Sequence, residues 1–320
     1  MQQGNTLEKL PLSTKPRAAL DAARKSLGSI ILGKDGEISL ALACLLARGH
    51  LLIEDLPGLG KTILAQSLAR VLGLSFQRIQ FTSDLLPADI VGVSIFRQES
   101  GQFEFQRGPV FAELVLADEV NRATPKAQSA LLEAMEERQV SVDGQTHALP
   151  TPYFVVATQN PSDQIGTFPL PESQLDRFLM RLELGYPNEE NERALLTGTD
   201  RRQMVTEITP SLNPAMLAAL QDAVAQVHMT DPLVDYVQAL VRFTRESPDI
   251  ETGLSPRGSL ALVAAARAHA YVEGHSGVFP DDVQAVFACV AGHRLKPASN
   301  SAYRTPAELS RYVLDNVNIP

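Results

Sequence analysis

The sequence predicts an α/β fold, in which a five-stranded parallel sheet with helices between its strands is followed by a second, all-helical domain. An apolar strand at 51–53 runs into a glycine-rich loop and then into a helical pattern. Strand and helix patterns alternate up to about residue 187, and the strand pattern then stops. Such alternation is typical of parallel sheets. We therefore expect two domains, at residues 1–187 and 188–320.

The composition indicates an ordinary soluble globular protein. The chain has 320 residues, of which 44% are hydrophobic and 20% charged, and its net charge is −9. An acidic chain without a long basic run is not expected to bind nucleic acid constitutively, although a local basic pore could exist in an acidic ring. We expect no signal peptide and no membrane span, and hence a cytoplasmic protein. Cys44 and Cys289 lie in apolar helical patterns and are expected to be buried thiols.

The chain begins with a polar, weakly patterned stretch at residues 1 to about 13, which predicts a loose arm. A helix is expected from Ala18 to Ile31, ending near Gly33, and a second from Glu37 to Arg48. The strand that follows spans 50–54.

The next element is a loop that is typical of phosphate binding. It leads into a helical pattern and contains Pro57, Gly58, Leu59, Gly60, Lys61, Thr62 and Ile63, which we predict to line a nucleotide. The glycines let backbone N–H groups turn toward an anion, and the helix start adds the positive end of its dipole. Lys61 is expected to reach the outer phosphates, and the Thr62 hydroxyl to ligate magnesium.

One position departs from the usual form of this loop, because Asp55 stands where the motif ordinarily begins with glycine. A plain Gly/Pro turn is the alternative interpretation. A Gly-Lys-Thr at a strand-to-helix junction argues against it.

Two acids end a later apolar strand, at Leu114-Val115-Leu116-Ala117-Asp118-Glu119. Asp118 is placed to hold magnesium, and Glu119 to orient and deprotonate the attacking water. Alone, such a pair is equally consistent with an exposed strand end. Downstream of a phosphate loop it predicts hydrolysis of a nucleoside triphosphate.

The other elements of the first domain surround these motifs. A strand at 76–81 precedes a short helix for which Ser83 or Asp84 is a candidate cap. Two hairpins are expected, and Asp143-Gly144 is a strong turn signal in the second. The hairpin strands span 94–97 with 102–105 and 139–142 with 145–149; a helix at 125–138 and strands at 153–158 and 178–184 complete the domain. The second domain is expected to hold helices at about 213–228, 231–247, 256–274, 280–294 and 305–316.

Taken in order, these motifs resemble the AAA+ ATPases, and more narrowly the MoxR family. The narrower resemblance spans roughly residues 15–297 and rests on strings at 54–62, 118–123, 128–135, 157–161, 170–178 and 255–257. It implies an AAA+ P-loop NTPase domain with hairpin inserts, a helical lid, and the cofactors ATP and Mg²⁺. Members of this family often carry an acid at the position of Asp55.

The resemblance also implies roles for single residues. Asn160 resembles sensor 1, an amide that bridges the attacking water and the γ-phosphate. Arg177 resembles the arginine finger that reaches the γ-phosphate of a neighbouring subunit, and Arg257 resembles sensor 2, acting in cis or in trans. Asn121 and Arg122 are weaker candidates for the subunit interface. Such residues at element ends are ordinarily solvated or capping, and Arg177 could simply pair with Asp176 or with a neighbouring acid in its own subunit.

At the level of function, the resemblance implies an ATP-hydrolysing ring, most often a hexamer, that remodels a client during maturation or metal or cofactor insertion, with a von Willebrand factor A domain protein as partner. A magnesium-chelatase-like motor subunit is the alternative, and a DNA helicase or translocase subunit is a weaker one that the acidic balance disfavours.

The two predicted hairpins match inserts that face the pore in related rings. Their Phe96, Phe103 and Phe105 could grip a client or pack on their own domain. The six histidines show no metal-ligand spacing and are expected to be structural or on the surface.

Overall fold

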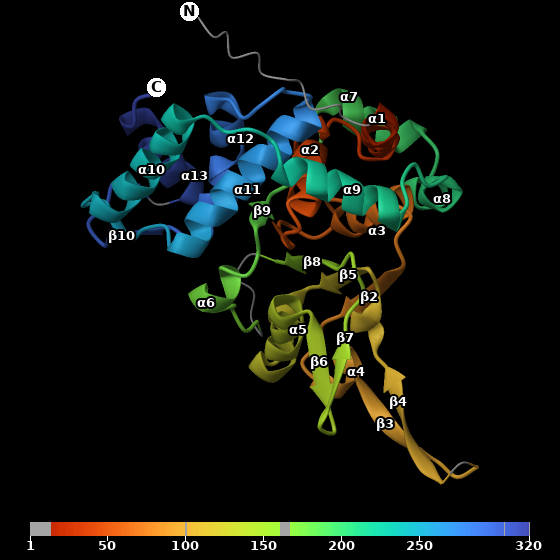
Figure 1. Ribbon diagram of the computed structural model, residues 1–320. Coiled ribbons are helices and arrows are strands. Elements are labelled where there is room, and N and C mark those ends of the chain that lie inside the picture. Colours follow the sequence, from red (N-terminus) through yellow and green to blue (C-terminus); the bar gives the residue numbers. More distant parts are fainter. Residues whose placement is uncertain (1–13, 100, 161–166, 304, 320) are drawn as a thin grey trace, which may run out of the picture.

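The computed structural model describes residues 14–99, 101–160, 167–303 and 305–319. The predicted arm at residues 1–13, and Pro161 of the sensor 1 string, lie outside the described residues. In the view of Figure 1 helices gather in the upper half, the sheet crosses the middle, and two hairpins extend downward.

The central sheet has five strands, all parallel, in the order β2-β5-β8-β1-β9, which confirms the predicted fold class. Because the strands are parallel, the carboxyl ends of β1, β5 and β8 meet at one edge of the sheet, where ligands bind in folds of this kind. The strands are β1 (Leu51–Glu54), β2 (Phe76–Gln80), β5 (Leu114–Asp118), β8 (Phe154–Gln159) and β9 (Met180–Leu182).

Both faces of the sheet are covered by helices, so strand side chains alternate between two apolar cores. Leu51 and Ile53 enter one core and Leu52 enters the other. The first core continues into the N-terminal and lid helices, and the second packs against α4 and α5. Cys44 is buried in the first core, as expected, whereas Cys289 is only partly buried and packs against that core.

The helices of the first part are α1 (Thr14–Ile30), α2 (Asp35–Leu46), α3 (Lys61–Val71), α4 (Pro87–Val91), α5 (Pro125–Glu137) and α6 (Glu172–Leu175). The prediction that Ser83 or Asp84 caps the short helix α4 is wrong. The N-cap is Leu86, whose N–H donates to the Asp89 carboxylate at 2.9 Å, and Pro87 begins the helix. Proline suits this position because its missing N–H would have no partner there.

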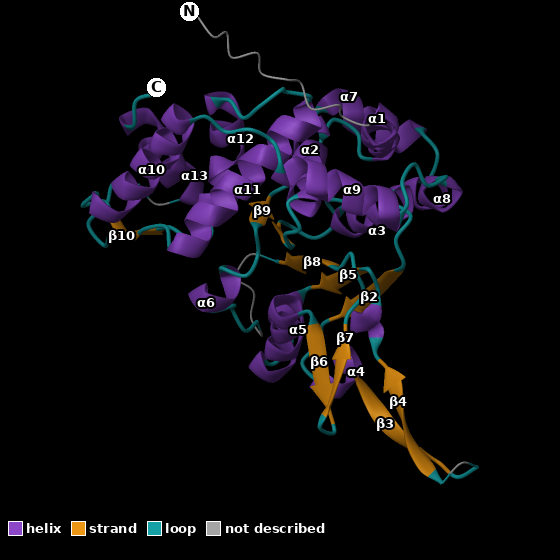
Figure 2. Cartoon of the chain, viewed as in Figure 1, coloured by secondary structure: helices purple, strands orange, loops and turns teal. Residues whose placement is uncertain are grey.

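Both predicted hairpins are present, as β3 (Gly92–Arg97) with β4 (Gln102–Arg107) and β6 (Gln139–Val142) with β7 (Gln145–Ala148). Asp143 and Gly144 have φ of 50° and 76°, the left-handed pair that a tight two-residue turn requires. Figure 2 shows that the β3–β4 hairpin extends furthest from the body.

The hairpin phenylalanines divide between the two expected roles. Phe105 stacks on His147 of the other hairpin, with 4.1 Å between the ring centroids. For this residue the structure supports packing on its own domain. Phe96 and Phe103 contact each other across the strands, and 51% and 73% of their surfaces are exposed. These two remain free to contact another molecule.

The second part of the chain is mostly helical, with α7 (Glu189–Thr197), α8 (Arg201–Glu207), α9 (Pro214–Ala225), α10 (Asp231–Glu246), α11 (Pro256–Glu273), α12 (Pro280–Ala291) and α13 (Pro306–Asn316). The expectation of an all-helical lid needs correction, because β10 (Ile250–Thr252) pairs with β11 (Lys296–Pro297). Strands of two or three residues leave no alternating pattern in a sequence. The sequence pattern did not locate the short helices α7 and α8.

The domain boundary near 187 stays a prediction. No helix among the described ranges is long and apolar enough to cross a membrane.

Candidate active site

The loop between β1 and α3 has the backbone of a phosphate cradle. Gly58 and Gly60 have φ of 88° and 87°, a conformation that L side chains rarely adopt. A Cβ added at either glycine would meet nothing within 4 Å, so the loop is open as well as turned. Gly60 is the N-cap of α3, and no side chain caps the helix. The loop therefore fits a phosphate group, which can accept from the free N–H groups of the first turn.

Lys61 begins α3 and is buried, with 7% of its surface exposed. Its ammonium donates to the Asp55 carbonyl at 2.5 Å and to Asn160 Oδ1 at 3.2 Å. Burial lowers the pKa of Lys61, and the carboxylates of Asp55, Asp118 and Glu119 oppose that shift. These acids keep a buried cation beside the phosphate loop. Thr62, the candidate magnesium ligand, follows in the same helical turn.

Asp118 ends β5 with both carboxylate oxygens engaged. Oδ1 accepts from the Thr158 hydroxyl at 2.6 Å, and Oδ2 accepts from the Arg78 guanidinium at 2.6 and 2.9 Å. Thr158 also accepts from the Glu119 N–H at 2.8 Å. Neighbouring strands thus hold the two acids in fixed positions.

Glu119 adopts φ 56°, a left-handed conformation that is uncommon for a residue other than glycine. Its Oε1 accepts from Asn160 Nδ2 at 3.3 Å. Its Oε2 accepts from Gln80 at 3.1 Å and from Arg122 at 2.9 Å. Strain of this kind is concentrated at functional sites, and it fits the water-activating role expected of Glu119.

Sequence reasoning missed Arg78, Gln80 and Thr158 as members of this site. Arg78 and Gln80 are two residues apart in β2, and in the pairing of β2 with β5, Gln80 is opposite Asp118. Their spacing of two was an available signal, because it places both polar side chains on the same face of the strand. Which residues these side chains meet depends on strand order, which the pattern does not give.

The weaker expectation that Asn121 faces a subunit interface is wrong. Asn121 is 2% exposed and donates to the Asn160 carbonyl at 3.1 Å. It therefore holds the backbone of Asn160 within its own subunit. Arg122 is exposed and pairs with Glu119.

Comparison with known proteins agrees with this geometry. Residues 50–180 match the ATPase family associated with various cellular activities (AAA), and residues 242–311 match the AAA lid domain. Chaperone MoxR1 of Mycobacterium tuberculosis is 44% identical over 86% of this chain and 75% of its own. Uncharacterized protein YeaC of Bacillus subtilis is 42% identical over 94% and 95%. The chain belongs to the MoxR family of AAA+ ATPases.

A solved structure supports the same conclusion. The crystal structure of a candidate ATPase from Cytophaga hutchinsonii superimposes with a TM-score of 0.85 at 33% identity, over 95% of this chain and 96% of that one. The two proteins therefore share one fold along almost the whole length of both chains.

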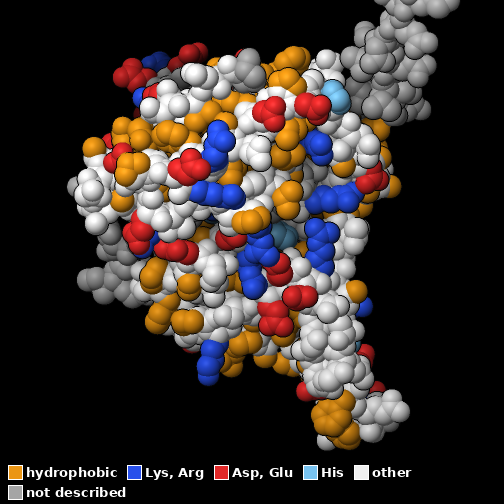
Figure 3. Space-filling view, turned by 60° about the vertical axis from the view of Figure 1, so that its left-hand side comes forward, with side chains coloured by type: hydrophobic (Ala, Val, Ile, Leu, Met, Phe, Trp, Pro, Cys, Tyr) orange, Lys and Arg blue, Asp and Glu red, His pale blue; other side chains and the backbone are white. Residues whose placement is uncertain are grey.

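The two arginines expected to sense phosphate in this MoxR-type protein, Arg177 and Arg257, lie together in a hollow that contains none of the loop residues described above. The hollow has a volume of about 240 Å³ and lies at the end of α5, where five arginines outnumber two acids: Arg48, Arg138, Arg177, Arg257, Arg294, Glu136 and Asp176. On the face shown in Figure 3, Lys and Arg side chains gather at mid-height.

The contacts of these arginines are local. Arg177 donates to the Leu132 carbonyl and Arg257 pairs with Glu136, both on α5. The suggested Arg177–Asp176 pair is wrong, because the Asp176 carboxylate accepts from the buried Arg294 at 2.6 Å. No contact of the described residues joins Arg177 or Arg257 to Lys61 or Glu119.

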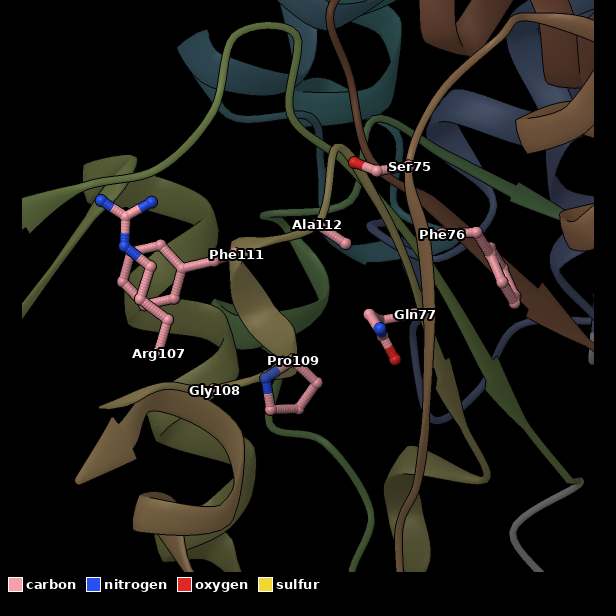
Figure 4. A pocket seen from close by; sticks show the side chains of 8 residues that line it. All are labelled: Ser75, Phe76, Gln77, Arg107, Gly108, Pro109, Phe111 and Ala112. Carbon is pink, nitrogen blue, oxygen red and sulfur yellow. The ribbon is translucent and has the colours of Figure 1, made fainter. Parts of the chain in front are cut away.

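A larger hollow, of about 460 Å³, lies beside edge strand β2 (Figure 4). Its one charged side chain, Arg107, extends over the Phe111 ring at 5.2 Å. It contains none of the acids or the lysine of the MoxR-type site, so size alone does not mark the active site. Among the described residues, no three His, Cys, Asp or Glu side chains are grouped so that they could hold a metal ion.

Proposed function

We propose that this protein binds Mg-ATP at the 57–63 loop and hydrolyses it. One observation carries the proposal: Lys61, Asn160 and Glu119 are joined in a single chain of contacts, with Asp118 beside them. Lys61 neutralises the outer phosphates, Glu119 accepts the proton of the attacking water, and Asn160 holds that water toward Glu119.

The donor set also suits magnesium. The Thr62 hydroxyl and the Asp118 carboxylate are hard oxygen ligands of the kind that Mg²⁺ prefers. When bound, Mg²⁺ would neutralise charge on the phosphates. The Asp118 carboxylate also pairs with the Arg78 guanidinium at 2.6 Å.

Replacing Lys61 by alanine is expected to weaken ATP binding at least tenfold, since the variant removes the side-chain cation nearest the phosphate loop. Isothermal titration calorimetry with ATP and Mg²⁺ measures this directly. Lys126→Ala, which removes an exposed lysine, serves as control and is expected to bind like wild type. Unchanged affinity in Lys61→Ala would show that the loop does not bind ATP as proposed.

We further propose that the active form is a ring, most simply a hexamer, in which Arg177 and Arg257 serve the ATP of a neighbouring subunit. Their shared hollow and their lack of contacts with their own loop support action in trans. ATPase activity per subunit is then expected to rise with protein concentration through the assembly range. Parallel light scattering gives the mass of the assembly. A strictly monomeric protein with concentration-independent activity would contradict the ring.

The proposed role of that ring is chaperone-like remodelling of a client in the cytoplasm, in maturation or in metal or cofactor insertion, with a von Willebrand factor A domain protein as partner. The name of Chaperone MoxR1 supports it, and the exposed Phe96 and Phe103 offer a surface for a client. Stimulation of the ATPase by such a partner supports this role. Stimulation by single-stranded DNA instead would favour a helicase or translocase subunit.

A further inference from the structure

Asp55, the acid at the usual glycine position of the phosphate loop, makes contacts that the ATPase chemistry does not explain. Its Oδ2 accepts from the backbone N–H groups of Leu184 and Gly185, both at 2.7 Å. Its Oδ1 accepts from the Leu56 N–H at 2.8 Å. One carboxylate therefore binds three backbone donors, two of which lie about 130 residues away in sequence.

The backbone of Asp55 completes the connection. Its carbonyl accepts from the Lys61 ammonium at 2.5 Å, and its N–H donates to the Gln159 carbonyl at 3.3 Å. Leu184 and Gly185 lie in the segment that leads from β9 to α7. A single residue thus bonds to the loop lysine, the end of β8, and the start of the connection to the helical part.

Simple electrostatics predicts that an acid at this position is unfavourable. A carboxylate beside a phosphate loop repels the polyanion that the loop is proposed to bind. A glycine would remove that repulsion and allow the turn equally well. The acid therefore needs a compensating role, and its three charge-assisted hydrogen bonds supply one.

We propose that Asp55 is a positioning residue, whose carboxylate anchors the phosphate loop to the segment between β9 and α7 and so holds the loop in its ATP-binding conformation. The proposal rests on the proposed binding of ATP at this loop. On this proposal, the acid that replaces the usual glycine links the nucleotide site to the segment that leads into the helical part of the chain.

The test compares Asp55→Ala with a matched control, Glu54→Ala. Glu54 is the preceding residue, and its carboxylate joins β1 to β9 through an ion pair with Arg181 at 2.9 Å. Both substitutions remove one negative charge near Lys61. Charge alone would leave ATP affinity unchanged or strengthen it in both variants. The proposed anchor instead predicts that Asp55→Ala weakens ATP binding about tenfold, while Glu54→Ala binds at least as tightly as wild type.

Calorimetric ATP affinities separate the outcomes. Asp55→Asn keeps one acceptor oxygen and is expected to fall between wild type and Asp55→Ala, which guards against an alanine variant that fails to fold. Equal or tighter binding by Asp55→Ala would overturn the proposal while leaving the ATPase function intact. Failure of wild type to bind ATP would instead reject the proposed function itself.

A second measurement does not depend on nucleotide. In hydrogen–deuterium exchange, the amides of Leu184 and Gly185 are expected to exchange at least tenfold faster in Asp55→Asn and Asp55→Ala than in wild type, because their acceptor is weakened or lost. In Glu54→Ala they should exchange as in wild type. Unchanged exchange at both amides in the Asp55 variants would show that the carboxylate does not hold this segment.

Discussion

Replacing Glu119 by glutamine is expected to lower ATP turnover by about 10²-fold or more, while ATP affinity stays within about threefold of wild type. The amide cannot accept a proton from water, so hydrolysis loses its base. Binding is retained because Lys61, Thr62 and Asp118 are untouched. Steady-state turnover and calorimetric affinity, measured on the same preparation, separate the two effects.

Glu137→Gln is the matched control, since it makes the same chemical change at an exposed position at the end of α5. It is expected to turn over ATP like wild type. Full activity in Glu119→Gln would remove this residue from the water-activating role. A joint loss of binding and turnover would indicate instead that Glu119 holds the site together through Gln80, Arg122 and Asn160.

Subunits carrying Arg177→Ala are expected to bind ATP normally and to lose turnover by about 10³-fold, the lower range for loss of an arginine finger. Mixing them with Glu119→Gln subunits should restore part of the activity. In mixed rings, some sites combine an intact Glu119 with the intact Arg177 of a neighbour. The measurement is turnover as a function of mixing ratio, after mass analysis has shown that mixed rings form.

The structure defines the alternative to this prediction. If Arg177 only bonds the Leu132 carbonyl in its own subunit, alanine would cost about 1 kcal/mol of stability and each subunit would keep its ATPase. Arg311→Ala, at an exposed position on α13, controls for loss of a positive charge. Mixed rings that stay inactive would argue against a role in trans.

Most of the first domain could be predicted because its signals are local. The glycines at 58 and 60 are needed for a left-handed turn wherever that loop occurs, and their φ values confirm it. Asp143-Gly144 predicts its hairpin for the same reason. Strand patterns that alternate with helical patterns predict a parallel sheet, because the connecting helices cover both of its faces.

The sequence by itself therefore determined the fold class, the phosphate loop and the pair of acids, because each depends on residues close together in the chain. Tertiary structure alone decided which partners meet across long separations. Arg78 reaches Asp118 because β2 lies beside β5, and Arg294 binds the Asp176 carboxylate, which the sequence offers only as an alternative partner for Arg177. The Asp55 carboxylate accepts from the Leu184 and Gly185 N–H groups only because β9 lies beside β1 in the sheet. Hydrogen bonds of this kind form wherever folding brings a donor close to an acceptor. The spacing of residues in the sequence does not predict which distant residues will meet.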